Sequence, residues 1–177
     1  MKILFFLLLL CLWLPAPAQQ AWQVQSSKVS FKIKNAGFYV DGSFADLEAK
    51  LLFAPEALAK SRIEAAVPVS SINTDNKSRD KHLRSDDYFD ATRYPEIKMQ
   101  SKRFTSKGNS FVGVFELQIK NVRKEIQIPF TWTKQGDLQL LKGNFKLNRL
   151  HYDVGSSSLI LGNEVLISIE LLLQENP

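Results

Sequence analysis

Apolar and polar residues alternate with a period of two through most of this chain. The alternation is clear where Val29, Phe31 and Ile33 stand between lysines and serines, and it returns from Ile126 to Trp132. A period of two places every second side chain on one face, so each such segment predicts a half-buried β-strand. About eight such segments are visible, near residues 29, 47, 63, 97, 111, 126, 138 and 165.

Short turn motifs separate these segments, among them Asp41-Gly42, Lys107-Gly108-Asn109 and Gln135-Gly136-Asp137. Gaps of this length suit antiparallel hairpins and leave no room for the crossovers that parallel strands need. Antiparallel strands with one apolar face each either stack as a sandwich or close into a barrel, and about eight strands make a barrel that holds one small ligand. The sequence therefore predicts an all-β fold, with the sandwich as the alternative to the barrel.

The N-terminus has the pattern of a secretory signal peptide. A lysine precedes an apolar run over residues 3–14, and Ala16 and Ala18 supply the small residues that cleavage requires. The run is too short to span a bilayer as a helix. We expect cleavage between Ala18 and Gln19, a periplasmic or secreted protein, and no transmembrane segment after cleavage.

Cys11 is the single cysteine and suggests a lipoprotein as an alternative, but three leucines precede it where small residues are needed. Removal of residues 1–18 removes Cys11, so residues 19–177 are expected to fold as one domain without a disulfide. The formal net charge is +5, and the basic residues are spread along the chain without a block of like charges. This distribution argues against nucleic acid as a partner and against a polybasic membrane anchor.

A polar run over residues 72–90 departs from the strand pattern. Its positive and negative charges nearly balance, which favours an ordered, internally paired segment. Thr74 or Asp75 is expected to cap a short helix over residues 77–83.

Further helical turns are expected on either side of this helix. Ser85 is predicted to cap another turn that reaches Phe89, so that Leu83, Tyr88 and Phe89 face the barrel. A proline followed by good helix formers predicts one more helical turn over residues 55–61.

His82 is the residue in the polar run that suggests catalysis or metal binding. The only other histidine is His151, and neither the spacing of a zinc site nor a nucleophile framed by glycines accompanies His82. No metal site and no catalytic residue is therefore predicted, and a lipid-modifying enzyme that uses His82 is kept as the weaker alternative. Arg79, Asp80 and His82 are instead predicted to form a hydrogen-bonded network that fixes a cap over the barrel mouth, and with Arg149 they are the candidates to contact a ligand head group.

Several motifs in order carry a resemblance that covers nearly all of residues 19–177. They are the run over residues 71–90, Tyr94-Pro95-Glu96-Ile97, and the segments 113–124, 143–149 and 161–165. On these motifs the chain resembles the YceI-like family of exported polyisoprenoid-binding proteins. The resemblance implies a lipocalin-like antiparallel barrel, capped at one end by short helical segments, that holds a long lipid tail with its polar head near one mouth.

Such a barrel needs large inward-facing side chains that leave a continuous slot between them. No cofactor is expected. The predicted ligand is an isoprenoid, a quinone or a fatty-acid derivative. An exported, stress-related structural or interaction protein with a filled barrel is the alternative, and a homodimer stays open. The predicted slot residues are Phe31, Phe44, Leu51, Leu83, Phe89, Met99, Phe115, Leu117, Phe130 and Phe145.

Overall fold

The computed structural model describes residues 21–176, and the predicted signal peptide with its cleavage site lies outside them. This part of the chain contains nine strands and four short helices. The strands are β1 (Ala21–Asn35), β2 (Phe38–Phe44), β3 (Glu48–Leu52), β4 (Arg62–Pro68), β5 (Glu96–Lys107), β6 (Ser110–Ile119), β7 (Val122–Gln135), β8 (Leu138–Asn148) and β9 (Leu161–Glu175). The helices are the α-helix α1 (Lys77–Leu83) and the 3₁₀ helices η1 (Pro55–Lys60), η2 (Val69–Ser71) and η3 (Arg149–Tyr152).

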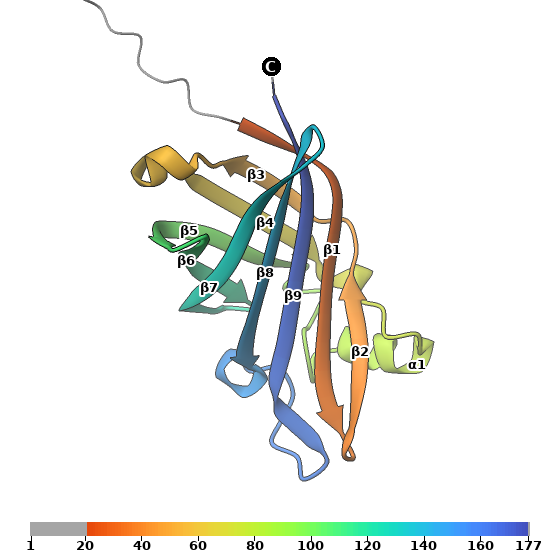
Figure 1. Cartoon of the computed structure of the whole chain (residues 1–177). Helices are drawn as coiled ribbons and strands as arrows, with labels where there is room; N and C mark the ends of the chain where they lie inside the picture. Colours follow the sequence, from red (N-terminus) through yellow and green to blue (C-terminus); the bar gives the residue numbers. More distant parts are fainter. Residues whose placement is uncertain (1–20, 177) are drawn as a thin grey trace, which may run out of the picture.

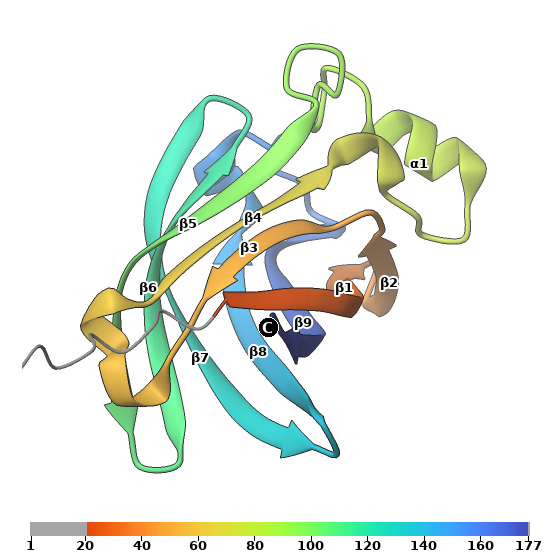
Figure 2. The same cartoon turned by 90° about the horizontal axis from the view of Figure 1, so that it is seen from above.

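The strands form one antiparallel sheet that closes on itself. From β3 to β9 each strand pairs with the next, and β1 closes the ring because it pairs with β3 on one edge and with β9 on the other. Eight strands therefore make the ring, and β2 extends it by pairing with the second half of β1 (Figures 1 and 2). The predicted antiparallel barrel is confirmed, and the sandwich is wrong.

The sheet opens locally along one edge of β1. Trp22 pairs with Leu51 of β3 and Val29 pairs with Phe44 of β2, which is a single unbroken register, yet residues 23–28 have no ladder partner on this edge within the described chain. The segment after β2 turns away from β1 at Ala45, which bonds to Ser71 instead. The amide of Ala45 donates to the hydroxyl of Ser71 at 3.1 Å, and this hydroxyl donates to the carbonyl of Ala45 at 3.0 Å. These bonds attach β2 to the segment that leads into residues 72–90, the polar run that forms the cap of the barrel.

One end of the barrel interior is a packed aromatic core. Phe53 is fully buried there, with ring centroids 5.4 Å from Phe104, 5.4 Å from Phe130 and 4.8 Å from Trp132. The indole of Trp22 donates a hydrogen bond to the carbonyl of Phe53 at 2.8 Å. Close packing of these rings leaves this end of the barrel filled.

Helix α1 lies beside β2 at the other end of the barrel (Figure 1). Its N-cap is Asn76, whose side-chain oxygen accepts from the amide of Arg79 at 3.0 Å. The predicted caps, Thr74 and Asp75, were wrong because Thr74 bonds to Asp80 instead and Asp75 adopts a left-handed conformation with φ of 57°. The helix itself was predicted correctly.

The predicted cap at Ser85 is also wrong. Its hydroxyl donates to the carbonyl of His82 at 2.7 Å and so closes the C-terminus of α1, while residues 85–90 form consecutive turns. The helical turn predicted over residues 55–61 is confirmed as η1. Within residues 21–176, none of the helices has the length and apolar character needed to span a membrane.

Candidate functional site

The barrel contains a cavity of about 560 Å³ at the end away from the aromatic core. Strands β1, β2, β4, β5, β6, β8 and β9 contribute to its wall, and the cap and the loop over residues 156–158 close it partly. Ile160 belongs to this wall and is 64 % exposed, so the cavity reaches the surface beside it. The wall is built mainly from aliphatic and aromatic side chains, which suits an apolar ligand.

Most of the predicted slot residues lie on this wall. Two of them meet across the seam between barrel and cap, where the rings of Phe44 and Phe89 are 6.1 Å apart edge to face. Met99 lies deeper, on β5, and its flexible thioether can adapt to ligands of different shape. The predicted residues on the wall are Phe31, Phe44, Leu83, Phe89, Met99, Leu117 and Phe145.

Leu51, Phe115 and Phe130 point inward but lie away from the cavity. They are 2 %, 3 % and 4 % exposed and belong to the core around Phe53. Their alternation is the same as that of the wall residues, and only their height along the barrel differs. We therefore assign these three side chains to the filled end and not to the slot.

Gly42 makes room for one wall residue. Phe31 and Gly42 are directly opposite on β1 and β2, and a Cβ atom at Gly42 would lie 2.2 Å from Cζ of Phe31. The ring of Phe31 therefore leans across the glycine. In this position it forms part of the cavity wall without filling the cavity.

A buried polar network fixes the start of the cap. Asp80 is 7 % exposed, and its carboxylate accepts from both the backbone amide of Thr74 at 2.9 Å and the hydroxyl of Thr74 at 2.6 Å. Arg79 donates from Nε to the same hydroxyl oxygen at 2.7 Å and from Nη2 to the carbonyl of Thr74 at 2.6 Å. The network ties α1 to the strand-like segment before it, so it positions the cap over the cavity.

His82 lies apart from this network. Its Nε2 is 3.6 Å from a carboxylate oxygen of Asp87, its ring packs edge to face on Tyr88 with centroids 4.9 Å apart, and its side chain is 60 % exposed. It contributes to the cavity wall from the cap side. Across residues 21–176, no group of three or more histidine, cysteine or acidic side chains is placed to hold a metal ion.

Arg149 is a buried cation that fastens the loop before β9. It is 3 % exposed and donates to the carbonyls of Val154, Leu161 and Gly162 at 2.9, 3.4 and 2.9 Å, and to Oδ1 of Asn163 at 3.1 Å. Burial lowers its pKa. No carboxylate pairs with it in the described part of the chain, so four neutral oxygens satisfy the guanidinium instead. The loop that Arg149 holds forms one side of the cavity mouth.

Several wall residues were missed by the sequence analysis. Ala65, Ile167 and Ile169 belong to strands whose alternation was recognised, so that signal was available. The loop over residues 156–158 consists of three serines, and its sequence contains no signal for its place at the mouth. The bonds of Arg149, together with those from the amide of Gly155 to the carbonyl of Asp87 at 3.1 Å and from the amide of Ala36 to the carbonyl of Ile160 at 2.8 Å, hold it there.

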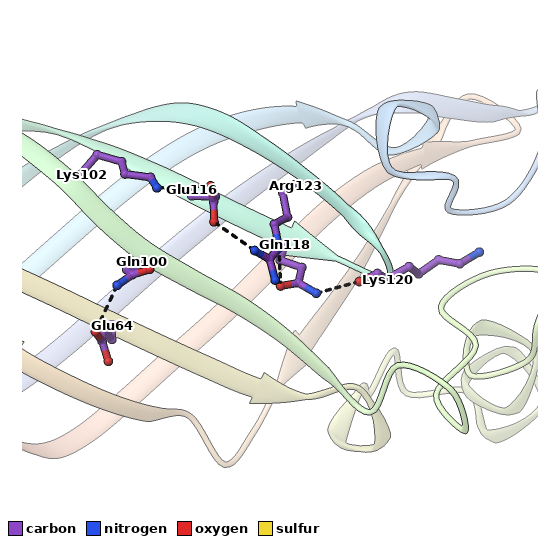
Figure 3. A network of polar contacts seen from close by, with 7 residues as sticks. All are labelled: Glu64, Gln100, Lys102, Glu116, Gln118, Lys120 and Arg123. Carbon is purple, nitrogen blue, oxygen red and sulfur yellow. Dashed lines mark hydrogen bonds and ion pairs between the residues drawn. The ribbon is translucent and has the colours of Figure 1, made fainter.

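The outer face of the same wall is polar. Glu116 lies 3.3 Å from Nζ of Lys102 and 3.9 Å from Nη1 of Arg123, and Gln100 donates to Glu64 at 3.3 Å (Figure 3). These side chains are outward on β4 to β7, and partly exposed pairs of this kind contribute little to stability. We assign them to the solvated surface of the barrel.

Comparison with known proteins places this barrel in a family. The model of the YceI-like domain matches residues 21–173. The chain belongs to the YceI-like family. The resemblance seen in the sequence is thereby confirmed.

Sequence relatives agree with this assignment. A UPF0312 protein of Photorhabdus laumondii is 30% identical over 103 residues, which are 58% of this chain and 54% of that protein. Protein YceI of Shigella flexneri is 27% identical over 114 residues, which are 64% of this chain and 60% of that protein. The matches thus span just over half of each relative's length.

Solved structures show the same fold. BcnA of Burkholderia cenocepacia superposes with a TM-score of 0.79 at 26% identity, over 82% of this chain and 95% of that chain. A polyisoprenoid binding domain from Saccharophagus degradans, implicated in plant cell wall breakdown, superposes with a TM-score of 0.69 at 13% identity, over 89% and 99% of the two chains. At 13% identity the likeness is one of fold alone.

Proposed function

We propose that this protein is an exported, non-catalytic carrier that holds the apolar tail of a long-chain lipid inside its barrel. The observation that carries the proposal is the apolar cavity of about 560 Å³ that reaches the surface at one end while the other end is filled. This volume falls within the usual range of ligand pockets, about 300–1,000 Å³. An apolar cavity that reaches the surface suits a tail that enters first and leaves its polar head outside.

The energetics favour such binding without any chemical step. Burial of apolar surface contributes about 25 cal/mol per Å², so a tail that buries roughly 400 Å² gains about 10 kcal/mol before the costs of ordering. His82 has an acidic neighbour, Asp87, but its ring is largely exposed on the cap. The cavity therefore supplies binding energy for a tail, and the proposed role needs no catalytic step from His82.

The head group is proposed to lie near the cap. Arg79 and His82 contribute to the cavity wall there and present donors to a phosphate, hydroxyl or carbonyl oxygen. Arg149 is a weaker candidate, because its N–H groups are bonded to backbone carbonyls and to Asn163. A head group held by Arg79 and His82 at the cap agrees with either ligand class, a prenyl lipid or a fatty acid.

The compartment and the ligand class have separate support. Residues 1–18 have the pattern of a signal peptide, so we propose export to the periplasm or beyond as a single domain over residues 19–177. The Saccharophagus degradans domain with the same fold is named for polyisoprenoid binding, which favours an isoprenoid or a quinone. A protein with a filled barrel is disfavoured by the open cavity.

The decisive experiment identifies the ligand directly. Protein purified without detergent from an exporting host is extracted with organic solvent, and the extract is analysed by mass spectrometry. A stoichiometric long-chain lipid is expected. An empty extract, together with no binding of fluorescent isoprenoid or fatty-acid probes by the delipidated protein, would refute the proposal.

A further inference from the structure

Among the described residues, four large apolar side chains are fully or largely exposed. Phe38 is 78 % exposed, Tyr39 55 %, Leu159 107 % and Ile160 64 %. A single exposed apolar side chain is ordinary, but a cluster on one surface indicates an interaction site. We call these four residues the apolar tip.

The apolar tip joins two segments that are far apart in the sequence. The amide of Ala36 in the β1–β2 turn donates to the carbonyl of Ile160 at 2.8 Å, and Asn35 pairs with Leu161 at the end of the β1–β9 ladder. Figure 1 shows the β1–β2 turn and the loop before β9 side by side, at the end of the barrel away from the C-terminus. The two loops therefore lie side by side at the same end of the barrel.

A tight turn leads directly into the two aromatic residues of the tip. Ala36 and Gly37 form the turn with φ of 50° and 87°, the combination of two positive φ values that a tight hairpin of the I′ type requires. Phe38 begins β2 directly after this turn and pairs with Asn35. The hairpin thus presents Phe38 on an ordered strand end.

The apolar tip borders the mouth of the cavity. Asn35 and Val40 of the hairpin contribute to the cavity wall, and Ile160 belongs to both the wall and the tip. The loop over residues 156–158, which precedes Leu159, lines the same opening with three serines. A surface that covers the tip therefore also covers the route into the barrel.

The charges around the tip suit a lipid head-group layer. Nζ of Lys34 lies 5.6 Å from the ring centroid of Tyr39, and Lys32 pairs with Asp41 at 3.1 Å. Lys34 is therefore the cation beside the tip that no ion pair neutralises in the described chain. Tyrosine and lysine are residues that locate at membrane interfaces, with the ring at the head groups and the ammonium toward phosphate.

We propose that the apolar tip is a membrane-docking surface. Phe38, Leu159 and Ile160 enter the boundary between head groups and acyl chains, and Tyr39 with Lys34 lies at the level of the head groups. The cavity mouth then faces the bilayer, so a tail can pass between membrane and barrel without crossing water; this last step rests on the proposed function. A second copy of the chain is the less suitable occupant, because two loop tips supply far fewer residues than the roughly 20–30 per side of a stable protein interface.

The test compares binding to vesicles with binding of a lipid in solution. The full chain is expressed in an exporting host, and its partition is measured by co-sedimentation with vesicles of phosphatidylcholine alone or with an equal part of phosphatidylglycerol. Phe38→Ser and Leu159→Ser are each expected to lower the partition coefficient about tenfold, and about a hundredfold together. The matched control, Phe38→Leu with Leu159→Ile, keeps the apolar surface and is expected to keep vesicle binding.

Two further measurements distinguish a failure of the docking proposal from a loss of lipid binding or of folding. Affinity for cis-parinaric acid in solution is expected to be unchanged in the double serine variant, and its thermal unfolding should match that of the original protein. If the original protein does not bind vesicles, or the serine variant binds them equally, the docking proposal is wrong even where cis-parinaric acid still binds. If the serine variant instead changes only the sedimentation coefficient from dimer to monomer, the tip is an interface between copies and the membrane proposal is overturned.

Discussion

Ala65 lies on the cavity wall, pointing inward from β4 between Ala49 of β3 and Met99 of β5. Replacement of Ala65 by leucine adds about three carbon atoms to the space that a lipid tail would occupy. Each methylene of a tail gains about 0.8 kcal/mol on burial, so displacement of about three of them costs about 2.4 kcal/mol. This is a loss of roughly sixtyfold in affinity.

The same substitution has the opposite effect on stability. Leucine fills part of an empty apolar cavity in the ligand-free protein, which is expected to raise the free energy of unfolding by about 0.5–2 kcal/mol. Binding falls and stability rises, and this combination separates occupation of the cavity from general damage to the fold. A variant that merely misfolds would lose both.

The assay is titration of delipidated protein with cis-parinaric acid, paired with urea unfolding of the same samples. Ala59→Leu is the matched control, because Ala59 is exposed on η1 and receives the same added carbons outside the cavity. Its affinity is expected to match that of the original protein. If Ala65→Leu binds the probe within threefold of the original while folding normally, the tail does not occupy this cavity.

Three further predictions concern single side chains. Tyr152 is 2 % exposed, and its hydroxyl is the buried side-chain group without a hydrogen-bond partner in the described chain. Tyr152→Phe is therefore expected to raise the free energy of unfolding by about 1 kcal/mol, measured by urea denaturation at neutral pH. Burial raises the pKa of Tyr152, so the original protein loses stability as the pH rises from about 10 through the higher folded-state pKa; this loss should be smaller in the phenylalanine variant, and equal slopes would contradict the assignment. Asp80→Ala removes both bonds from Thr74 and is expected to cost about 2–4 kcal/mol in the same assay, whereas a change below about 0.5 kcal/mol would show that the network does not hold the cap. Gly42→Ala places a Cβ atom 2.2 Å from the ring of Phe31 and should turn that ring into the cavity, so cis-parinaric acid binds more weakly; the double variant with Phe31→Leu should recover binding, and failure to recover would show that the ring is not the cause.

Alternation in the sequence does not predict how far along the barrel axis a side chain lies. Leu117 and Phe115 are two residues apart on β6 and both point inward, yet Leu117 lies on the cavity wall and Phe115 in the filled core. A period of two gives the face of a strand and nothing about height. The position along the barrel axis follows from the strand register and from the aromatic core around Phe53, which fills the other end of the barrel.

The cap shows a second limit. The sequence from Thr74 to Asn76 contains three consecutive residues that can each cap a helix, and local propensity does not rank them. Asn76 is the cap because Asp80 is buried and binds Thr74, a contact that depends on where the whole segment packs. The existence of α1 was predictable from the local pattern, but its first residue was set by a tertiary bond.

The sequence by itself determined that the chain forms antiparallel strands with one apolar face, and it located the polar segment that becomes the cap. These features are local, because hairpins join neighbours and alternation is read within a few residues. Tertiary structure decided the closure of the barrel, since β1 and β9 pair from opposite ends of the described chain. It also decided the cavity and the apolar tip, which exist only because that closure brings the β1–β2 turn against the loop before β9.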